Sequence, residues 1–186
     1  MNLADLPRIE VRLAGEGGQG MILAGIILAE AAAIHDGRNV VQSQSYGPEA
    51  RGGASRSEVI LSAQEIDYPE VITPNILVAL SQMAFDKYSA NLTSDGLLIV
   101  DEDKVRLGEN ARAVRLPISR LAMQATGKAI TANTVALGIL VGLTGLVTRE
   151  AIEKAVRRYA PPGTADLNSQ ALQAGFEQAE QIIRAG

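Results

Sequence analysis

Alternating and helix-like runs of apolar residues divide the first part of the chain into distinct elements. Residues Arg8 to Ala14 alternate polar and apolar positions, which is typical of a strand, and the Ala-rich stretch Gly20 to Ile34 reads as a helix. Val40 and Val41 mark a second strand, and the alternating residues Ser55 to Ser62 resemble an antiparallel strand. A strand, a glycine turn and a helix are therefore followed by an insertion that departs from a plain βαβ repeat.

Alternation of strand and helix resumes in the rest of the chain. Short apolar strands are predicted at Ile76 to Leu80, at Leu97 to Val100 and at Ala113 to Pro117. The predicted helices cover Gln82 to Tyr88, Ile118 to Thr126, Thr131 to Leu143, Thr148 to Tyr159 and Asp166 to Ile183. We therefore predict a single α/β domain over residues 1–186, a Rossmann-like open sheet that is mostly parallel, with an antiparallel insertion and helices on both faces.

Small residues recur at intervals of four in two of the predicted helices. Gly138 and Gly142 lie in one of them, and Ala171, Gly175 and Ala179 repeat along the last one. Such a face allows another backbone to approach closely. For Gly138 and Gly142, packing inside the core and packing against a helix of another subunit are equally compatible with the pattern.

Composition narrows the chemistry that this chain can perform. It has no cysteine and one histidine, which excludes iron–sulfur ligation, thiolate zinc sites and disulfides within the chain. A net charge of −4 with 3% aromatic residues argues against a nucleic-acid surface. Residues 1–7 lack a signal-peptide pattern, and the longest apolar stretch, Val135 to Val147, is too short to span a bilayer. We therefore expect a cytoplasmic protein without membrane contact.

The remaining polar residues of note are interpreted as structural. His35, beside Asp36, is expected to be a favourable cation at the end of a helix and not a catalyst. Asp101, Glu102 and Asp103 follow a strand, and because adjacent side chains alternate in direction, a solvated cap is favoured over a divalent metal site. No catalytic residue and no metal site are predicted in this chain.

A glycine turn of the pattern G-x-G-x-x-G follows the first strand and opens the first helix. There, backbone N–H groups at the free helix end can bind a phosphate. Two features disfavour NAD and FAD: Glu16 lies inside the turn, and no acidic residue follows Val40 and Val41. Tight packing of strand on helix is the alternative reading. The candidate anion contacts are Gly15, Gly17, Gly18, Gln19 and Gly20.

A second glycine segment follows the second predicted strand. It combines a rigid turn, the opposite charges of Glu49 and Arg51, and two adjacent glycines. We interpret it as a docking or ligand loop in which Arg51, with Arg56 as a further cation, meets a carboxylate or phosphate as a planar fork. An ordinary turn with an exposed ion pair is the alternative. The residues assigned to a subunit interface are Tyr46, Gly47, Pro48, Glu49, Arg51, Gly52 and Gly53.

Together, the G-E-G-G-Q-G turn and the Y-G-P-E-A-R-G-G segment resemble the γ subunit of the 2-oxoacid:ferredoxin oxidoreductases. The resemblance extends over essentially the whole chain, through Asn75 to Lys87, Asn133 to Leu137 and Asn168 to Ala179. It implies a complex with α and β subunits, and a ferredoxin-like δ subunit where present. Such a complex oxidatively decarboxylates a 2-oxoacid with coenzyme A to an acyl-CoA and passes two electrons to ferredoxin.

The resemblance also implies how the work is divided between subunits. Thiamine diphosphate, Mg2+ and the [4Fe-4S] clusters would sit in the partner subunits, and the γ chain, inactive alone, would help to form the coenzyme A channel. The positions that match the family motifs are the glycine and glutamine positions of the first turn and the Tyr46 to Gly53 segment, with Arg51 as a candidate coenzyme A contact.

The sequence of the second glycine segment indicates which 2-oxoacid the complex uses. It looks more like the 2-oxoglutarate type than the pyruvate type, which predicts conversion of 2-oxoglutarate, coenzyme A and oxidised ferredoxin to succinyl-CoA, CO2 and reduced ferredoxin. A stand-alone Rossmann-like nucleotide-binding or regulatory module is the alternative. In isolation, an exposed docking surface favours a homodimer.

Overall fold

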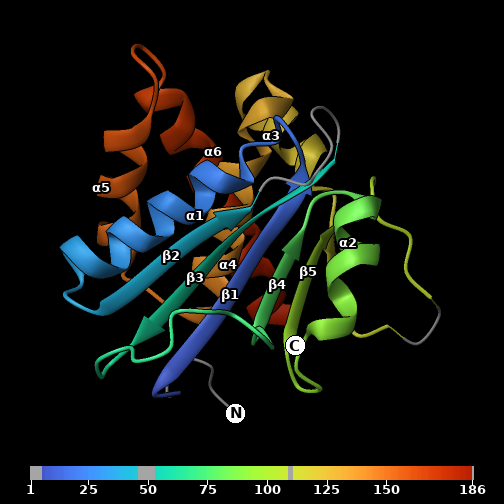
Figure 1. Ribbon diagram of the computed structural model, residues 1–186. Coiled ribbons are helices and arrows are strands. Elements are labelled where there is room, and N and C mark those ends of the chain that lie inside the picture. The colour runs from blue at the N-terminus through green and yellow to red at the C-terminus, as the bar shows by residue number, and fades with distance from the viewer. Residues whose placement is uncertain (1–5, 46–52, 109–110, 186) are drawn as a thin grey trace.

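A mixed sheet of six strands, in the order β2-β3-β1-β4-β5-β6, organises the computed structural model, which describes residues 6–45, 53–108 and 111–185 (Figure 1). Strands β1, β4, β5 and β6 are parallel, whereas β3 runs antiparallel between β2 and β1. The predicted open sheet with an antiparallel insertion is therefore confirmed. The strands are β1 (Arg8–Glu16), β2 (Asn39–Ser45), β3 (Ala54–Ser62), β4 (Ile76–Ala79), β5 (Leu97–Asp101) and β6 (Val114–Leu116).

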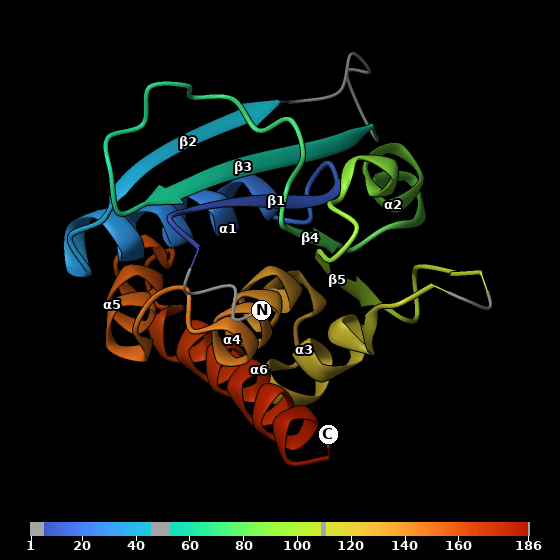
Figure 2. The same cartoon turned by 90° about the horizontal axis from the view of Figure 1, so that it is seen from below.

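Helices cover both faces of the sheet, but unequally. Figure 2 shows α1, α3, α4, α5 and α6 on one side of the sheet and α2 on the other. The helices are α1 (Met21–Glu30), α2 (Gln82–Tyr88), α3 (Ile118–Thr126), α4 (Ala132–Thr144), α5 (Arg149–Tyr159) and α6 (Ala165–Ala185). A π-helical turn, Ala31–His35, continues α1, and 3-10 turns lie at Ser89–Asn91 and Ala129–Thr131. Among the described elements, one face of the sheet thus carries a thick helical layer and the other carries α2.

Side-chain caps fix the start of two helices. The hydroxyl of Ser81 accepts a hydrogen bond from the Ala84 N–H at 3.2 Å, and that of Thr148 accepts one from the Ala151 N–H at 3.2 Å. Both bonds satisfy donors that have no partner within the helix. Thr148 also donates its hydroxyl proton to Asp36 at 2.7 Å, which ties the start of α5 to the end of the π-helical turn.

The larger core lies between the sheet and the thick helical layer, and it is mainly aliphatic. Ile9, Val11 and Leu13 of β1 point into it and are at most 1% exposed. Helix α4 is buried at each position from Ala132 to Val141 because it lies between the sheet and α6 (Figure 2). Close packing of aliphatic residues therefore builds most of this core, in a sequence with only 3% aromatic residues.

Glycines allow α4 and α6 to pack at very short range. A Cβ atom on Gly138 would overlap the carbonyl oxygen of Leu172, and one on Gly175 would overlap that of Val135. The small residues of α6 therefore face α4 of the same chain. Of the two readings that the sequence allows for Gly138, packing inside the core is the one that the structure supports.

The acidic triplet Asp101, Glu102 and Asp103 at the end of β5 differs in part from the solvated cap that the sequence predicts. Asp101 is 0% exposed, and its carboxylate accepts hydrogen bonds from the N–H and the hydroxyl of Ser119 and from the Asp103 N–H. The prediction is wrong for Asp101 because the start of α3 lies against the end of β5 and needs an acceptor. Glu102 and Asp103 form ion pairs with Arg120. Within the described residues, no group of three His, Cys, Asp or Glu side chains is placed to hold a metal ion.

Candidate functional site

The glycine turn lies at the point in the sheet from which successive parallel strands are added on opposite sides. From β1 the chain passes through α1 to β2 on one side, whereas from β4 it passes through α2 to β5 on the other (Figure 1). The carboxyl ends of the parallel neighbours β1 and β4 therefore border a topological switch point. Ligands of open α/β sheets characteristically bind in the crevice at such a point.

Helix α1 begins in this turn without a side-chain cap. Its N-cap is Gly20, with φ of 73°, and the first intrahelical bond runs from the Ala24 N–H to the Gly20 carbonyl at 3.0 Å. Glu16, Gly17 and Gly18 are exposed next to this helix end. Backbone N–H groups in the first turn of a helix favour a bound anion when no side chain caps them.

The glycines of the turn differ in how much space the surrounding residues leave for a side chain. A Cβ atom on Gly15 would overlap the Gln19 side chain, and one on Gly20 would overlap Asn133. A Cβ atom on Gly17 would meet nothing in the described structure nearer than the Gly53 carbonyl oxygen at 4.0 Å, and Gly17 has no positive φ. Internal packing therefore accounts for Gly15 and Gly20 but not for Gly17.

Gln19, predicted as an anion contact, forms hydrogen bonds within the chain. Its side-chain oxygen accepts a hydrogen bond from the Glu16 N–H at 2.7 Å, and its nitrogen donates one to the Leu80 carbonyl at 3.2 Å. The first bond lies within the turn, and the second connects the turn to Leu80, directly after β4. Gln19 thus braces the turn across the switch point.

Asn133 of α4 holds the turn from the opposite side, and the sequence analysis missed it as a site residue. Its side-chain nitrogen donates to the Gly20 carbonyl at 3.1 Å, and its oxygen accepts from the Thr134 N–H at 2.9 Å. The Thr134 hydroxyl in turn donates to Asn168 of α6 at 3.1 Å. The available signal was a pair of polar residues, Asn133 and Thr134, at the start of an otherwise apolar helix.

Most of the second glycine segment lies outside the described residues, namely Tyr46, Gly47, Pro48, Glu49, Ala50, Arg51 and Gly52. Its last residue, Gly53, is described, and its carbonyl accepts a hydrogen bond from the Gly17 N–H at 3.2 Å. Beside it, Ala54 pairs with Glu16 across β3 and β1. The end of the second segment therefore contacts the first turn directly.

A buried group of charges lies on the face of the sheet that α2 covers. Arg12 and Glu58 are 3% and 7% exposed, and the Arg12 Nε donates to the Glu58 carboxylate at 2.7 Å. Arg12 also donates to the Val71 carbonyl at 3.2 Å. Arg56, predicted as a further cation for a ligand, lies 3.4 Å from the same carboxylate, and both guanidinium groups lie 5.4 Å from the centre of the Tyr88 ring. Two cations therefore share one carboxylate here.

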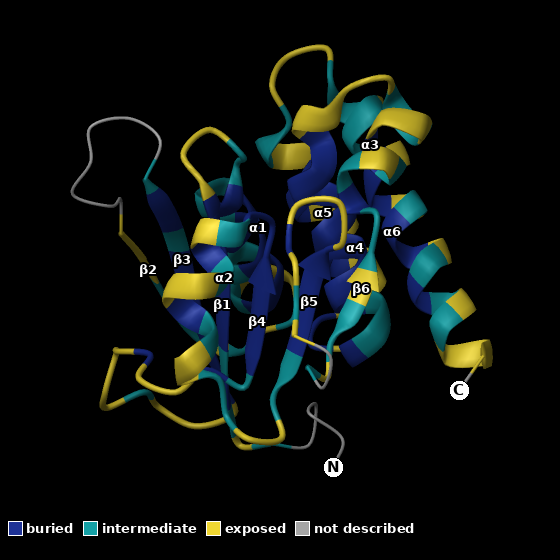
Figure 3. Cartoon of the chain, turned by 90° about the vertical axis from the view of Figure 1, so that its right-hand side faces the viewer, coloured by how far each residue is buried: buried dark blue, intermediate teal, exposed yellow. Residues whose placement is uncertain are grey.

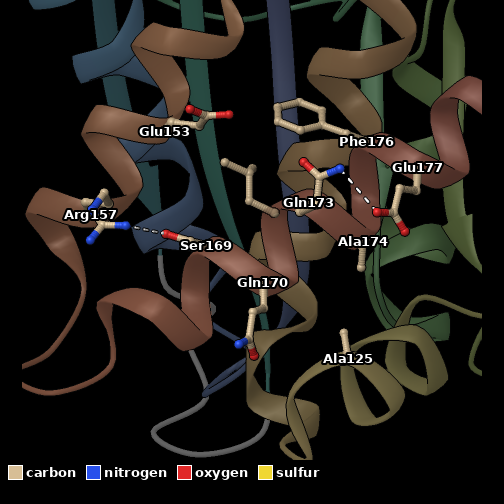
Figure 4. Close-up of a pocket in the computed structure, with 10 residues that line it drawn as sticks. Ala125, Glu153, Arg157, Ser169, Gln170, Gln173, Ala174, Phe176 and Glu177 are labelled. Atoms are coloured by element: carbon tan, nitrogen blue, oxygen red, sulfur yellow. Dashed lines mark hydrogen bonds between the residues drawn. The ribbon is translucent and has the colours of Figure 1, made fainter.

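A groove of about 520 Å³ lies between α5, α6 and α3, and Figure 4 shows its lining. Two pairs of its polar side chains are hydrogen-bonded: Arg157 with Ser169 at 3.2 Å, and Gln173 with Glu177 at 3.2 Å. None of the predicted site residues lines it. The groove therefore adds nothing to the candidate site.

In the described ranges 6–45, 53–108 and 111–185, no helix is both long enough and apolar enough to cross a bilayer.

Comparison with known proteins finds matches along almost the whole chain. A family model described as pyruvate ferredoxin/flavodoxin oxidoreductase matches residues 10–178. The 2-oxoglutarate synthase subunit KorC of Methanocaldococcus jannaschii is 47% identical over 179 residues, covering 94% of this chain and 96% of the relative. KorC of Methanothermobacter thermautotrophicus is 51% identical over 178 residues, covering 91% and 94%.

Other subunits of Methanothermobacter thermautotrophicus are less similar. The ketoisovalerate oxidoreductase subunit VorA is 36% identical, covering 96% of this chain and 38% of the relative, and the pyruvate synthase subunit PorC is 28% identical, covering 94% and 97%. Among solved structures, the gamma subunit of a keto/oxoacid ferredoxin oxidoreductase from Geobacter sulfurreducens PCA superposes with a TM-score of 0.85 at 49% identity. That match covers 95% of this chain and 98% of the other.

Proposed function

This chain belongs to the pyruvate ferredoxin/flavodoxin oxidoreductase family, and from that membership we propose that it is the γ subunit of a 2-oxoglutarate:ferredoxin oxidoreductase. The complex converts 2-oxoglutarate, coenzyme A and oxidised ferredoxin to succinyl-CoA, CO2 and reduced ferredoxin. The observation that carries this proposal is the full-length similarity to KorC subunits, which exceeds the similarity to the ketoisovalerate and pyruvate subunits. The resemblance to γ subunits that the two glycine motifs indicate is thereby confirmed.

The redox groups of the complex belong to partner subunits in this proposal. The [4Fe-4S] clusters need cysteine thiolates as ligands, and the Mg2+ that accompanies thiamine diphosphate needs oxygen ligands such as carboxylates. This chain has no cysteine and one histidine, and the residues described in its structure offer no metal-binding group. The α and β subunits, and a ferredoxin-like δ subunit where present, are thus the partners that would hold these groups and pass electrons to ferredoxin.

The glycine turn is the part of this chain that we assign to coenzyme A. The uncapped start of α1 suits a phosphate group, and the exposed Gly17 and Gly18 leave the backbone open to close approach. Arg51, which lies outside the described residues, is proposed as a further cation for this ligand, and the support is that the segment containing it ends at Gly53, which contacts the turn. The turn thus contributes ligand binding, while the reacting groups come from elsewhere in the complex.

Co-purification tests the proposed function. We expect the native chain to co-elute with brown, iron-containing partners, and the assembled complex to reduce a viologen dye only when 2-oxoglutarate and coenzyme A are both supplied. The chain alone should be colourless and inactive. A native chain that has no thiamine-dependent partner and binds a nucleotide alone would favour the stand-alone module instead.

Gly17→Ala tests the assignment of the turn to coenzyme A. Because the fold has room for the added methyl group, we expect an unchanged melting temperature. In the assembled complex, the KM for coenzyme A should rise about tenfold, which corresponds to about 1.4 kcal/mol of binding, because the methyl group blocks approach to the backbone. The matched control is Gly108→Ala, where a Cβ atom also meets nothing within 4 Å. An unchanged KM in Gly17→Ala would show that the turn is scaffolding.

A further inference from the structure

The Arg56 side chain, on the face of the sheet that α2 covers, has a buried donor without an acceptor. Its Nε lies 3.4 Å from the Glu58 carboxylate, but this atom donates no hydrogen bond within residues 6–45, 53–108 and 111–185. Arg12, in contrast, donates to Glu58 at 2.7 Å and to the Val71 carbonyl at 3.2 Å. Because a buried N–H group without an acceptor is costly, the Arg56 side chain favours a further anionic partner.

The position of Arg56 connects this donor with the glycine turn. Across β3 and β1, Arg56 pairs with Ala14, the residue directly before Gly15 of the turn. Figure 3 shows α2 in front of β1 and β3, and the ring of Tyr88 in α2 lies 5.4 Å from the Arg56 guanidinium. The Arg56 side chain is 33% exposed, so it is accessible to a ligand beside the turn.

Positive charge is in excess around the Tyr88 ring. Arg12, Arg56 and Lys87 each lie 5.4 Å from the ring centre. Among the described residues, Glu58 is the one carboxylate that forms an ion pair with Arg12 or Arg56. Three cations and one carboxylate leave a net charge of +2 in this group. The ligand group that matches it best carries about two negative charges.

Coenzyme A, the ligand assigned to the glycine turn, has one group with this charge. Its 3′-phosphate is a phosphomonoester, which carries a charge of about −1.5 to −2 at pH 7. The pyrophosphate is attached to the 5′ position of the same ribose, so the two phosphate sites lie close together, as do Arg56 and the turn. A carboxylate of a partner subunit carries less charge and would leave part of the excess without a counterion.

We propose that Arg56 binds the 3′-phosphate of coenzyme A and thereby selects coenzyme A over dephospho-coenzyme A, which lacks that group. Arginine suits this role because its planar fork donates two parallel hydrogen bonds to phosphate oxygens. Arg12 and Glu58 are positioning residues, since Arg12 holds the carboxylate and the carboxylate lies against the Arg56 Nε. The proposal rests on the proposed function and names the residue that recognises one part of its ligand.

Steady-state kinetics of the assembled complex with coenzyme A and with dephospho-coenzyme A test this assignment. We expect the native complex to have a KM at least about tenfold higher for dephospho-coenzyme A, which corresponds to about 1.4 kcal/mol. Arg56→Met should raise the KM for coenzyme A by a similar factor and leave the KM for dephospho-coenzyme A unchanged. Arg56→Lys, which keeps the charge but not the fork, should raise the KM for coenzyme A by a smaller factor.

Dephospho-coenzyme A is the internal control, because damage to the fold or to subunit assembly would raise both KM values. Arg115→Met removes an exposed arginine from the edge strand β6 and should change neither KM. Arg56→Lys retains a cation beside Glu58, so it provides the same test if Arg56→Met does not assemble. Equal use of both substrates by the native complex, or equal changes of both KM values in the Arg56 variants, would overturn the proposal. A complex that does not use coenzyme A with 2-oxoglutarate would refute the proposed function itself.

Discussion

Replacing Gly175 with alanine will lower the melting temperature of the chain by roughly 4–8 °C, because α4 and α6 must move apart to admit the methyl group. The new Cβ atom would overlap the Val135 carbonyl oxygen and lie 2.8 Å from the Gly138 Cα. Both neighbours are backbone atoms, so no side chain can rotate away. We expect a cost of about 3 kcal/mol, which exceeds the gain of about 1 kcal/mol in helix propensity.

Thermal unfolding followed by circular dichroism measures this loss. Gly138→Ala should cost a similar amount from the other helix, and the two changes together should cost less than their sum because they share one contact. Gly108→Ala is the control, since its Cβ atom would meet nothing within 4 Å. If Gly175→Ala melted like the control, the close approach of the two helices would be refuted.

Replacing Arg12 with methionine will destabilise the chain by about 3–5 kcal/mol, because Glu58 is then left as a buried charge with weaker support. The Arg56 guanidinium is 3.4 Å from Glu58, whereas Arg12 donates to it at 2.7 Å. The Val71 carbonyl also loses the donor that Arg12 provides. Urea denaturation gives the free energy of unfolding directly.

A double substitution distinguishes the stability that the ion pair contributes from the cost of leaving one buried charge without its partner. We expect Arg12→Met combined with Glu58→Leu to recover much of the loss, because apolar residues of similar size can replace a buried ion pair. Lys154→Met is the control: it removes an ion pair with Glu150 whose side chains are 55% and 77% exposed, and it should cost less than about 1 kcal/mol. If Arg12→Met and Lys154→Met lowered the free energy of unfolding equally, burial would not make the loss of an ion pair more costly.

Local sequence pattern was sufficient to predict most of the elements. Helices α2 and α3 begin and end at the predicted residues, because serine before one, proline before the other and glycine after α3 mark their ends. Strand ends were less accurate. β1 continues to Glu16 and β2 to Ser45 because pairing with β3 extends them past the apolar positions that the pattern detects.

Long-range contacts explain what the sequence pattern could not predict. Arg12 lies at a polar position of an alternating strand and looks solvent-exposed, but its partner Glu58 is 46 residues away. Asn133 reaches Gly20 across 113 residues. Asp101 is buried because α3 begins against it, and no neighbouring residue in the sequence signals this contact. Burial of a polar residue depends on partners that a local window does not contain.

The candidate site was predicted in part. The position of the glycine turn after β1 and before α1 follows from the sequence alone. The distinction between Gly15 and Gly20, which packing requires, and Gly17, which it does not, needed the three-dimensional contacts. The contact between Gly17 and Gly53 also joins two motifs that the sequence presents separately.

The central position of β1 has a consequence for biosynthesis. This strand leaves the ribosome before the other strands of the sheet, yet its neighbours are β3, which ends at Ser62, and β4, which ends at Ala79. One of its edges therefore stays unpaired in the nascent chain until β3 has emerged, and the other until β4 has emerged. During that interval an apolar strand is exposed to other polypeptides, which makes the N-terminal part of this chain a natural client for chaperones that bind extended segments.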